Sequence, residues 1–208
     1  MTTGEITGVT VREAGEGDWP AVAEIVNHYI AVSTVNFRTA PQTAGEWENH
    51  WARHHESHPW LVAVGERATG DAGEAAGGPP DGCAGGIQVL GIAYAGPWSE
   101  RNAYDWCTEV SVYVRHGAQG RRVGQALYRR LLAAVDAQGF RTQIAVIGLP
   151  NDASVGFHES FGFRRAGTLA AVGFKHDTWC DVGYWQRTPV PSPEAPGPLL
   201  PCSAVLGD

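Results

Sequence analysis

The stretch from residue 106 to 128, WCTEVSVYVRHGAQGRRVGQALY, constrains the fold most. Over residues 110–114, valine alternates with polar or aromatic side chains, which predicts a strand. The glycine-containing segment 116–120 interrupts this alternation, and from residue 123 to 135 apolar residues recur at helical spacing. The stretch therefore predicts a strand, a short turn and a helix.

The turn is basic, because it carries Arg115, His116, Arg121 and Arg122. A strand that enters a helix through a short turn leaves backbone N–H groups free at the helix N-terminus, where the helix dipole favours an anion. The arginine side chains add positive charge at the same place. We therefore expect this turn to hold a phosphorylated ligand.

Composition limits the other classes of function. The net charge of −7 argues against a general nucleic-acid surface, and no apolar run reaches the ~20 residues of a membrane span. The first ten residues show no secretory signal. Four scattered cysteines show neither metal-ligand spacing nor a disulfide framework, so we expect no metal and a reducing, cytoplasmic environment.

The remaining patterns predict one α/β domain on a mixed, mostly antiparallel sheet flanked by helices. We expect an N-terminal tail over 1–8, the domain over 9–188 with a flexible Gly-rich loop at 65–86, and a Pro-rich disordered tail over 189–208. Strands are expected near 9–14, 60–64, 89–96, 110–114, 143–149, 168–174 and 180–186, and helices near 19–32, 43–55, 123–137 and 150–160.

The turn resembles the signature Q/R-x-x-G-x-G/A of the GNAT superfamily of acyl-CoA N-acetyltransferases, whose element order the chain shares. In the preferred frame the signature falls on Gln119, Gly120, Arg121, Arg122, Val123 and Gly124. Arg122 then stands where the family has glycine. A second frame, 121–126, fits the letters fully. The resemblance implies that this turn cradles the pyrophosphate of acetyl-CoA.

The resemblance is more specific over most of residues 9–185. The words IVNHYI, STVNFRT, PWLVA, GIAYAGPW, RNAYDW, AVIGLPND and GFKH are similar to the phosphinothricin and methionine sulfoximine N-acetyltransferase branch. This resemblance implies acetyl-CoA as the acetyl donor, the free amine of a small amino-acid analogue as acceptor, and a homodimer.

Two residues have the chemistry for acetyl transfer. Glu109, in the word YDWCTEVSVYV, matches the family's general base and is expected to accept a proton from the acceptor ammonium. His158 stands where much of the superfamily has a tyrosine, and an imidazolium there can protonate the leaving thiolate. A solvent-facing strand carboxylate and a packed helix histidine are the alternatives.

Further residues are expected around the donor. By resemblance, Asn151 and Ser154 hydrogen-bond the pantetheine arm of CoA, although Asn151 is equally suited to capping the helix after Pro150. Backbone groups of Val112, Tyr113 and Val114 are expected to pair with the same arm. A bulge near Val110 is one way to free a strand N–H for the thioester carbonyl.

An anionic acceptor needs cationic or hydrogen-bonding partners. Arg101 is the first candidate, because a guanidinium binds a carboxylate or phosphinate bidentately. Phe37 and Tyr104 are expected to wall the acceptor pocket. Weaker candidates are Arg38, Lys175 and His176.

Two other functions remain open at this stage. One keeps the fold and the donor but uses an aminoglycoside, a polyamine or a protein N-terminus as acceptor. The other is a CoA-binding module without catalysis, against which the presence of both Glu109 and His158 argues.

Overall fold

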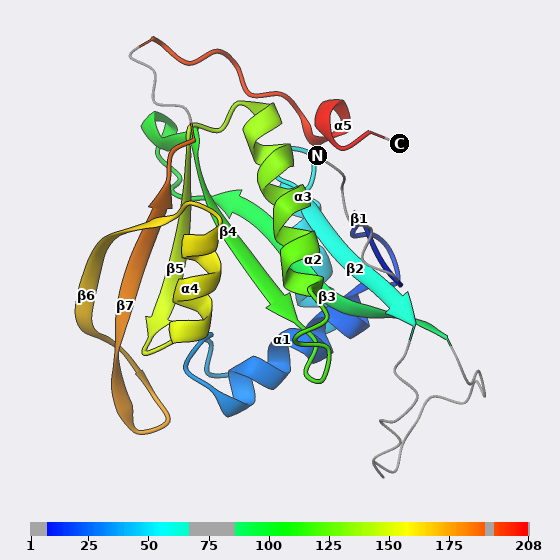
Figure 1. Cartoon of the computed structure of the whole chain (residues 1–208), viewed down its shortest axis with the longest axis vertical. Helices are drawn as coiled ribbons and strands as arrows, with labels where there is room; N and C mark the ends of the chain where they lie inside the picture. The colour runs from blue at the N-terminus through cyan, green and yellow to red at the C-terminus, as the bar shows by residue number, and fades with distance from the viewer. Residues whose placement is uncertain (1–7, 67–85, 190–193, 208) are drawn as a thin grey trace.

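The computed structural model describes residues 8–66, 86–189 and 194–207. Most of the expected N-terminal tail (1–8) and most of the expected loop at 65–86 lie outside these ranges. Seven strands form one sheet in the order β1-β2-β3-β4-β5-β7-β6 (Figure 1). They are β1 (Val9–Glu13), β2 (Trp60–Glu66), β3 (Ile87–Pro97), β4 (Cys107–Val114), β5 (Thr142–Leu149), β6 (Arg164–Lys175) and β7 (Thr178–Arg187).

The helices follow the predicted order. They are α1 (Trp19–Val32), α2 (Ala44–His54), α3 (Val123–Gln138) and α4 (Asp152–Ser160), with the short additions η1 (Asn102–Tyr104) and α5 (Cys202–Val205). Neighbouring strands are antiparallel except β4 and β5, which are parallel. The predicted mixed, mostly antiparallel α/β fold is therefore confirmed, while η1 and α5 were not expected.

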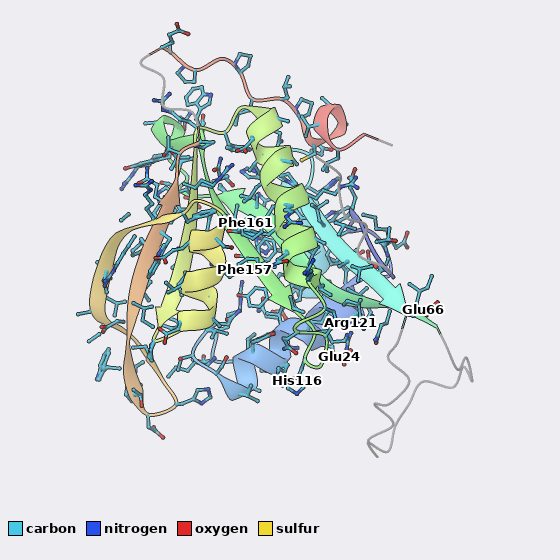
Figure 2. All side chains as sticks on the ribbon, viewed as in Figure 1. Glu24, Glu66, His116, Arg121, Phe157 and Phe161 are labelled. Carbon is cyan, nitrogen blue, oxygen red and sulfur yellow. The ribbon has the colours of Figure 1, made fainter. Side chains whose placement is uncertain are left out.

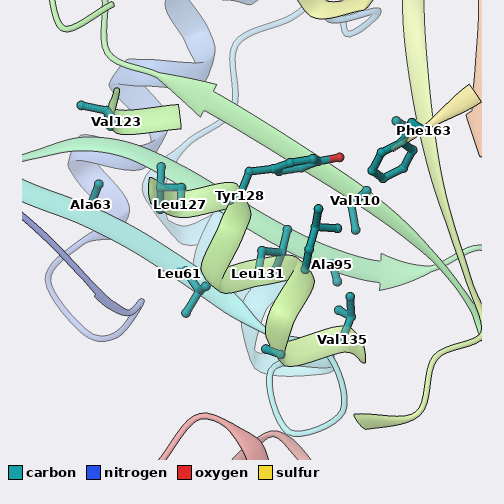
Figure 3. Packing of buried hydrophobic residues seen from close by; sticks show 14 of the residues in the cluster. Leu61, Ala63, Ala95, Val110, Val123, Leu127, Tyr128, Leu131, Val135 and Phe163 are labelled. Atoms are coloured by element: carbon teal, nitrogen blue, oxygen red, sulfur yellow. The ribbon is translucent and has the colours of Figure 1, made fainter. Parts of the chain in front are cut away.

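The two faces of the sheet bury different side chains because successive residues of a strand point to opposite sides. On β2, Leu61 and Ala63 belong to the cluster under α3, whereas Trp60 and Val62 pack with α1 and α2. Figure 3 shows the α3 side of the sheet, where apolar side chains of α3 meet those of the strands. Around β2 and β3 the sheet is thus covered on both faces.

Local sequence explains the ends of several helices. Pro20 lies in the first turn of α1, where its missing N–H is not needed. Thr43 and Glu46 form a reciprocal capping box at the start of α2. Gly139 ends α3 in the left-handed conformation with φ 97°, as expected for a C-terminal glycine.

The C-terminal segment differs from the expected disordered tail. Within residues 194–207, Cys202 and Leu206 are 4% and 9% exposed and join the core cluster beside α3. The Gln138 amide donates to the carbonyl oxygen of Leu200 at 2.9 Å, and the Leu200 N–H donates to the Gln138 carbonyl at 2.9 Å. The expectation was wrong here because composition weighted the prolines and overlooked the apolar side chains between 199 and 206 that bury against α3.

None of the helices within the described ranges has the length and apolarity of a membrane-spanning helix.

Candidate active site

The site begins where two central strands separate. β4 pairs with β5 only from Cys107 to Glu109, opposite Thr142 to Ile144, and beyond this point no pairing between them continues. A cavity of about 340 Å³ lies in the gap. Its walls are contributed by α1, β4, the turn before α3, α3, β5 and α4, and include Tyr29, Val110, Ser111, Val112, Tyr113, Val114, Gln119, Gly124, Val146, Ile147, Asn151, Ser154, Phe157 and His158.

This gap changes the expected source of free strand N–H groups. The β3–β4 register runs without a shift from Gly91–Val114 to Pro97–Thr108, so the bulge considered near Val110 is not present in that pairing. The free edge of β4 arises instead because β5 leaves it after Glu109. Val112, Tyr113 and Val114 all line the gap, as predicted for residues that meet an extended ligand.

The basic turn lies at one end of the cavity. Figure 2 labels His116 and Arg121 of this turn and Glu24 of α1, and Glu24 pairs with Arg115 of the turn at 2.7 Å. Gln119 braces the turn, because its side-chain oxygen accepts from the Gly117 N–H at 2.7 Å. At the helix start, Arg122 provides no side-chain cap, so the first amides of α3 are not satisfied by this residue. These amides and the positive end of the helix dipole favour an anion.

Arg122 keeps the backbone conformation that a glycine would have at this place. Its φ is 60° and its ψ is 15°, in the left-handed region that L-residues seldom adopt, and Gly120 before it has φ 80°. The preferred frame of the signature, with Arg122 at the glycine position, therefore agrees with the local geometry. The turn retains its shape and gains a guanidinium.

Gly124 lies at the crossing of α3, β4 and α4. A Cβ atom there would be 3.3 Å from Val114 Cγ2, which is a tight contact, and 3.5 Å from Phe157 Cε2, which is an ordinary one. Gly124 also lines the cavity. Its lack of a side chain keeps the cavity open beside the turn.

Helix α4 brings Asn151, Ser154 and His158 into the cavity. The side-chain oxygen of Asn151 accepts from the Ser154 N–H at 3.1 Å, so Asn151 does cap the helix. The predicted capping role and the position beside the cavity are thus both present in one residue.

His158 is held in a defined orientation. Its Nδ1 lies 2.7 Å from the carbonyl oxygen of Ser154, and because a carbonyl only accepts, Nδ1 carries the proton. The rings of Tyr128, Phe157 and Phe163 surround it, with centroids 5.2 to 5.5 Å away. Burial lowers the pKa of His158, and the bond to Ser154 opposes this shift. The neutral imidazole is therefore favoured near pH 7, with Nε2 as an acceptor.

The aromatic residues around His158 link α4 to α3. Figure 2 labels Phe157 and Phe161 on the side of α4 that faces α3. Both rings lie 5.1 Å from the ring of Tyr128, centroid to centroid. This apolar packing fixes α4 and so fixes His158.

Glu109 lies where β4 and β5 last pair, on the same side of β4 as Ser111 and Tyr113. Burial raises the pKa of Glu109. Tyr94, opposite Ser111 on β3, hydrogen-bonds the Ser111 side chain, and burial raises the pKa of this tyrosine also. A carboxylate with a raised pKa, next to phenol groups that stay neutral, is suited to accept a proton near neutral pH.

The expected acceptor residues are not brought together. Phe37 is 37% exposed and its ring packs on Gly148 and Gly173. Arg101 is exposed before η1, and its hydrogen bonds within the described ranges involve only its backbone, which donates to Ser99 Oγ and accepts from the Tyr104 N–H. Tyr104 lines a different cavity, at the start of β4. The main cavity therefore contains neither Arg101 nor Tyr104.

Sequence reasoning missed three residues of this region. The Asn36 side-chain amide donates to the Tyr113 hydroxyl at 3.0 Å, and the Tyr29 hydroxyl donates to the Val114 carbonyl at 2.6 Å. Tyr94 reaches Ser111, as described above. Asn36 and Tyr29 occur in the family-like words STVNFRT and IVNHYI, but their contacts with β4 span about 80 residues and have no local signal.

Comparison with known proteins agrees with this geometry. The sequence model described as "Acetyltransferase (GNAT) family" matches residues 22–163. The chain belongs to this family. It is 48% identical over 198 residues to phosphinothricin N-acetyltransferase of Streptomyces viridochromogenes. This alignment covers 95% of this chain and 96% of the relative. It is 30% identical to the L-methionine sulfoximine/L-methionine sulfone acetyltransferase of Pseudomonas paraeruginosa, over 90% of this chain and 98% of the relative.

Solved structures of GNAT proteins have the same fold. The phosphinothricin acetyltransferase of Sinorhizobium meliloti, solved in complex with AcCoA, has a TM-score of 0.74 and 29% sequence identity to this chain. The match covers 87% of this GNAT chain and 88% of the solved one.

Proposed function

We propose that this protein transfers the acetyl group of acetyl-CoA to the free amine of a small amino-acid-like substrate such as phosphinothricin or methionine sulfoximine. The observation that carries the proposal is the gap between β4 and β5, which has the basic turn at one end and Glu109 where the strands meet. The names of the relatives at 48% and 30% identity support the same donor chemistry and the same acceptor class.

The donor is proposed to lie along the gap. The turn formed by Gln119, Gly120, Arg121, Arg122, Val123 and Gly124 would hold the pyrophosphate, and backbone groups of β4 would pair with the pantetheine arm over residues 112–114. Asn151 and Ser154 would face the same arm. The AcCoA complex of the Sinorhizobium meliloti relative supports a donor site in this fold.

The chemistry follows from two groups with different pKa shifts. Ionised Glu109 accepts one proton from the acceptor ammonium, directly or through water. The freed amine nitrogen attacks the thioester carbonyl carbon, and the C–S bond breaks as the amide forms. Because His158 is neutral beforehand, it can protonate the sulfur only with a proton that it first receives. We propose that this is the second proton lost by the attacking nitrogen.

The acceptor side is proposed in less detail. Phe37 would form one wall near β5 and β6, where its ring lies against Gly148 and Gly173. Arg101 and Tyr104 remain our proposed acceptor ligands from the sequence, although they lie outside the main cavity. Arg101→Ala tests this directly, since loss of an acceptor ligand raises the acceptor KM and leaves the acetyl-CoA KM unchanged.

The oligomeric state, the cellular location and the partners of the protein are also proposals. A homodimer is supported by apolar side chains exposed on β6 and β7, among them Phe174 at 54% and Trp179 at 64%. Light scattering on the purified chain would give its mass in solution. A cytoplasmic location, no metal requirement, and no nucleic-acid or membrane partner stay predictions from the sequence.

A thiol-release assay with acetyl-CoA and a panel of amines tests the proposed function. We expect CoA release with L-phosphinothricin and L-methionine sulfoximine, and little release with polyamines or aminoglycosides. Release with polyamines alone would overturn the acceptor class. No release with any amine would overturn the catalytic assignment.

A further inference from the structure

Lys175, at the end of β6, is the only lysine among the 15 Lys and Arg residues of the chain. It is only 7% exposed. Arginine serves at every other cationic position of this sequence. Since an ammonium is a compact point charge and a guanidinium is a broad planar fork, a single buried lysine marks a place where the compact cation is required.

The ammonium of Lys175 has unused bonding capacity. Nζ donates to the carbonyl oxygen of Asn36 at 2.6 Å, and this is its one hydrogen bond among the described residues. An ammonium has three N–H donors, so two are left. The salt bridges of the described residues involve Arg12, Arg115 and Arg187, so no carboxylate there pairs with Lys175.

A buried cation without a counter-ion is costly, and proteins seldom keep one unless an anion completes it. Burial lowers the pKa of Lys175, in keeping with a charge that lacks a partner, and the Cys180 thiol opposes this shift. Arg38, two residues after Asn36, differs because it is exposed to water. Lys175 is therefore the cation that an incoming anion would compensate.

Lys175 does not line the main cavity, but it lies behind one of its walls. Its partner Asn36 also binds the hydroxyl of Tyr113, which lines the main cavity. Phe37, the proposed acceptor wall, packs on Gly173, two residues before Lys175. Asn36 thus links the Lys175 ammonium to Tyr113, which forms part of the cavity wall on β4.

We propose that Lys175 forms the anion subsite for the acceptor, pairing with the carboxylate of an amino-acid-like substrate beside Asn36. The inference rests on the proposed function and extends it, because it assigns the acceptor carboxylate to Lys175 and leaves the phosphinate or sulfoximine group to Arg101. It would also explain the preference for anionic acceptors that we expect in the thiol-release assay.

The single lysine makes a direct test possible in the wild-type chain. Labelling lysine with ¹⁵N at Nζ gives one side-chain NMR signal, from Lys175. With CoA present, saturating L-phosphinothricin should shift this signal, whereas 3-aminopropyl(methyl)phosphinate, which lacks the carboxylate, should not. An equal shift with both compounds would assign the subsite to the phosphinate and overturn the carboxylate pairing. An unchanged signal, with acceptor binding confirmed by calorimetry, would overturn the subsite altogether.

Steady-state kinetics provide a second test of the Lys175 subsite. Lys175→Met keeps side-chain length and removes the charge, so the KM for L-phosphinothricin should rise about tenfold or more while the KM for acetyl-CoA stays unchanged. The KM for the analogue without the carboxylate should not change. Arg164→Met, which removes an exposed cation from the same strand, is the matched control.

The outcomes separate this inference from the proposed function. If the wild type acetylates no amino-acid-like amine in the thiol-release assay, both fail. If it does, but Lys175→Met raises the KM of both acceptors equally, the residue only supports the segment around Asn36, and the subsite is wrong while the proposed function stands.

Discussion

Glu109 of β4 and Ile144 of β5 are the last paired residues before the two strands separate. The carboxylate proposed as general base therefore lies where the gap begins, and the cavity extends from there toward the turn before α3. Burial at this junction raises the pKa of Glu109. The junction of the two strands thus combines the start of the cavity with a carboxylate whose pKa is raised.

Replacing Glu109 by glutamine should lower kcat by roughly 10²–10⁴, the usual contribution of a general base. The change keeps the size of the side chain, so binding of acetyl-CoA should remain the same by calorimetry. Glu48→Gln, an exposed carboxylate on α2, is the matched control. A Glu109→Gln variant with wild-type turnover between about pH 6 and 9 would remove Glu109 from the mechanism.

The pH dependence has a defined sign. Glu109 must be ionised to accept a proton, so kcat/KM should fall as the pH falls through its pKa, which burial has raised above the ordinary value of 4.5. The acid limb should be lost in Glu109→Gln. A pH–rate profile with an unchanged acid limb in that variant would assign the limb to another group.

Gly124→Asp should abolish acetyl-CoA binding. The new Cβ would lie 3.3 Å from Val114 Cγ2, and the carboxylate would repel phosphate at the start of α3. Calorimetry with acetyl-CoA measures the loss, and Gly45→Asp, in the open first turn of α2, should bind normally. The pyrophosphate assignment would be contradicted if the wild type bound CoA and dephosphorylated pantetheine equally well.

Arg122 should respond to substitution as a left-handed residue does. Replacing it by glycine removes roughly 1 kcal/mol of backbone strain but costs a similar amount of unfolded-state entropy, so stability should hardly change. Arg122→Val should lose about 1 kcal/mol or more, because a β-branched residue is poorly accommodated at φ 60°. Chemical denaturation of the three proteins tests this, and a valine variant as stable as the glycine variant would contradict it.

The histidines on and after α2 predict loss of stability in acid. Burial lowers the pKa of His50 and of His58 to about 4, and the charges of His54, Arg53 and Arg38 add to this at His50. The folded state then binds fewer protons than the unfolded chain, so stability should fall as the pH drops from about 6.5 to 4.

Thermal melts across this range measure the effect. The double variant His50→Gln with His58→Gln should flatten the dependence, whereas His176→Asn, at an exposed turn, should keep it. An unchanged slope in the double variant would show that other groups cause the acid loss.

The sequence was sufficient to predict elements that have a local hydrophobic period and residues that lie in a stretch similar to the family. The alternation over 110–114 and the helical spacing from Val123 placed β4 and α3 correctly, and the match around Glu109 placed it on the central strand. The left-handed conformation of Arg122 was not predicted, although the signature has glycine at this position, the residue that adopts this conformation most readily.

Other features depend on contacts between distant segments, which leave no local pattern. β4 and β5 separate after Glu109 and Ile144, where β5 goes on pairing with β7. The hydrogen bond from Asn36 to Tyr113 joins residues 77 positions apart. The position of the η1 segment in the fold, and so that of Arg101 and Tyr104, is likewise set by tertiary packing. The C-terminal segment was misjudged because its few buried residues outweigh its average composition.

The central claim, acetyl transfer from acetyl-CoA to an anionic amino acid, is tested most directly by kcat/KM for L-phosphinothricin compared with a polyamine such as spermidine in the same thiol-release assay. The account predicts a strong preference for L-phosphinothricin. Glu109→Gln should lose this activity, because it removes the general base. A preference for spermidine, or equal values for the two amines, would contradict it.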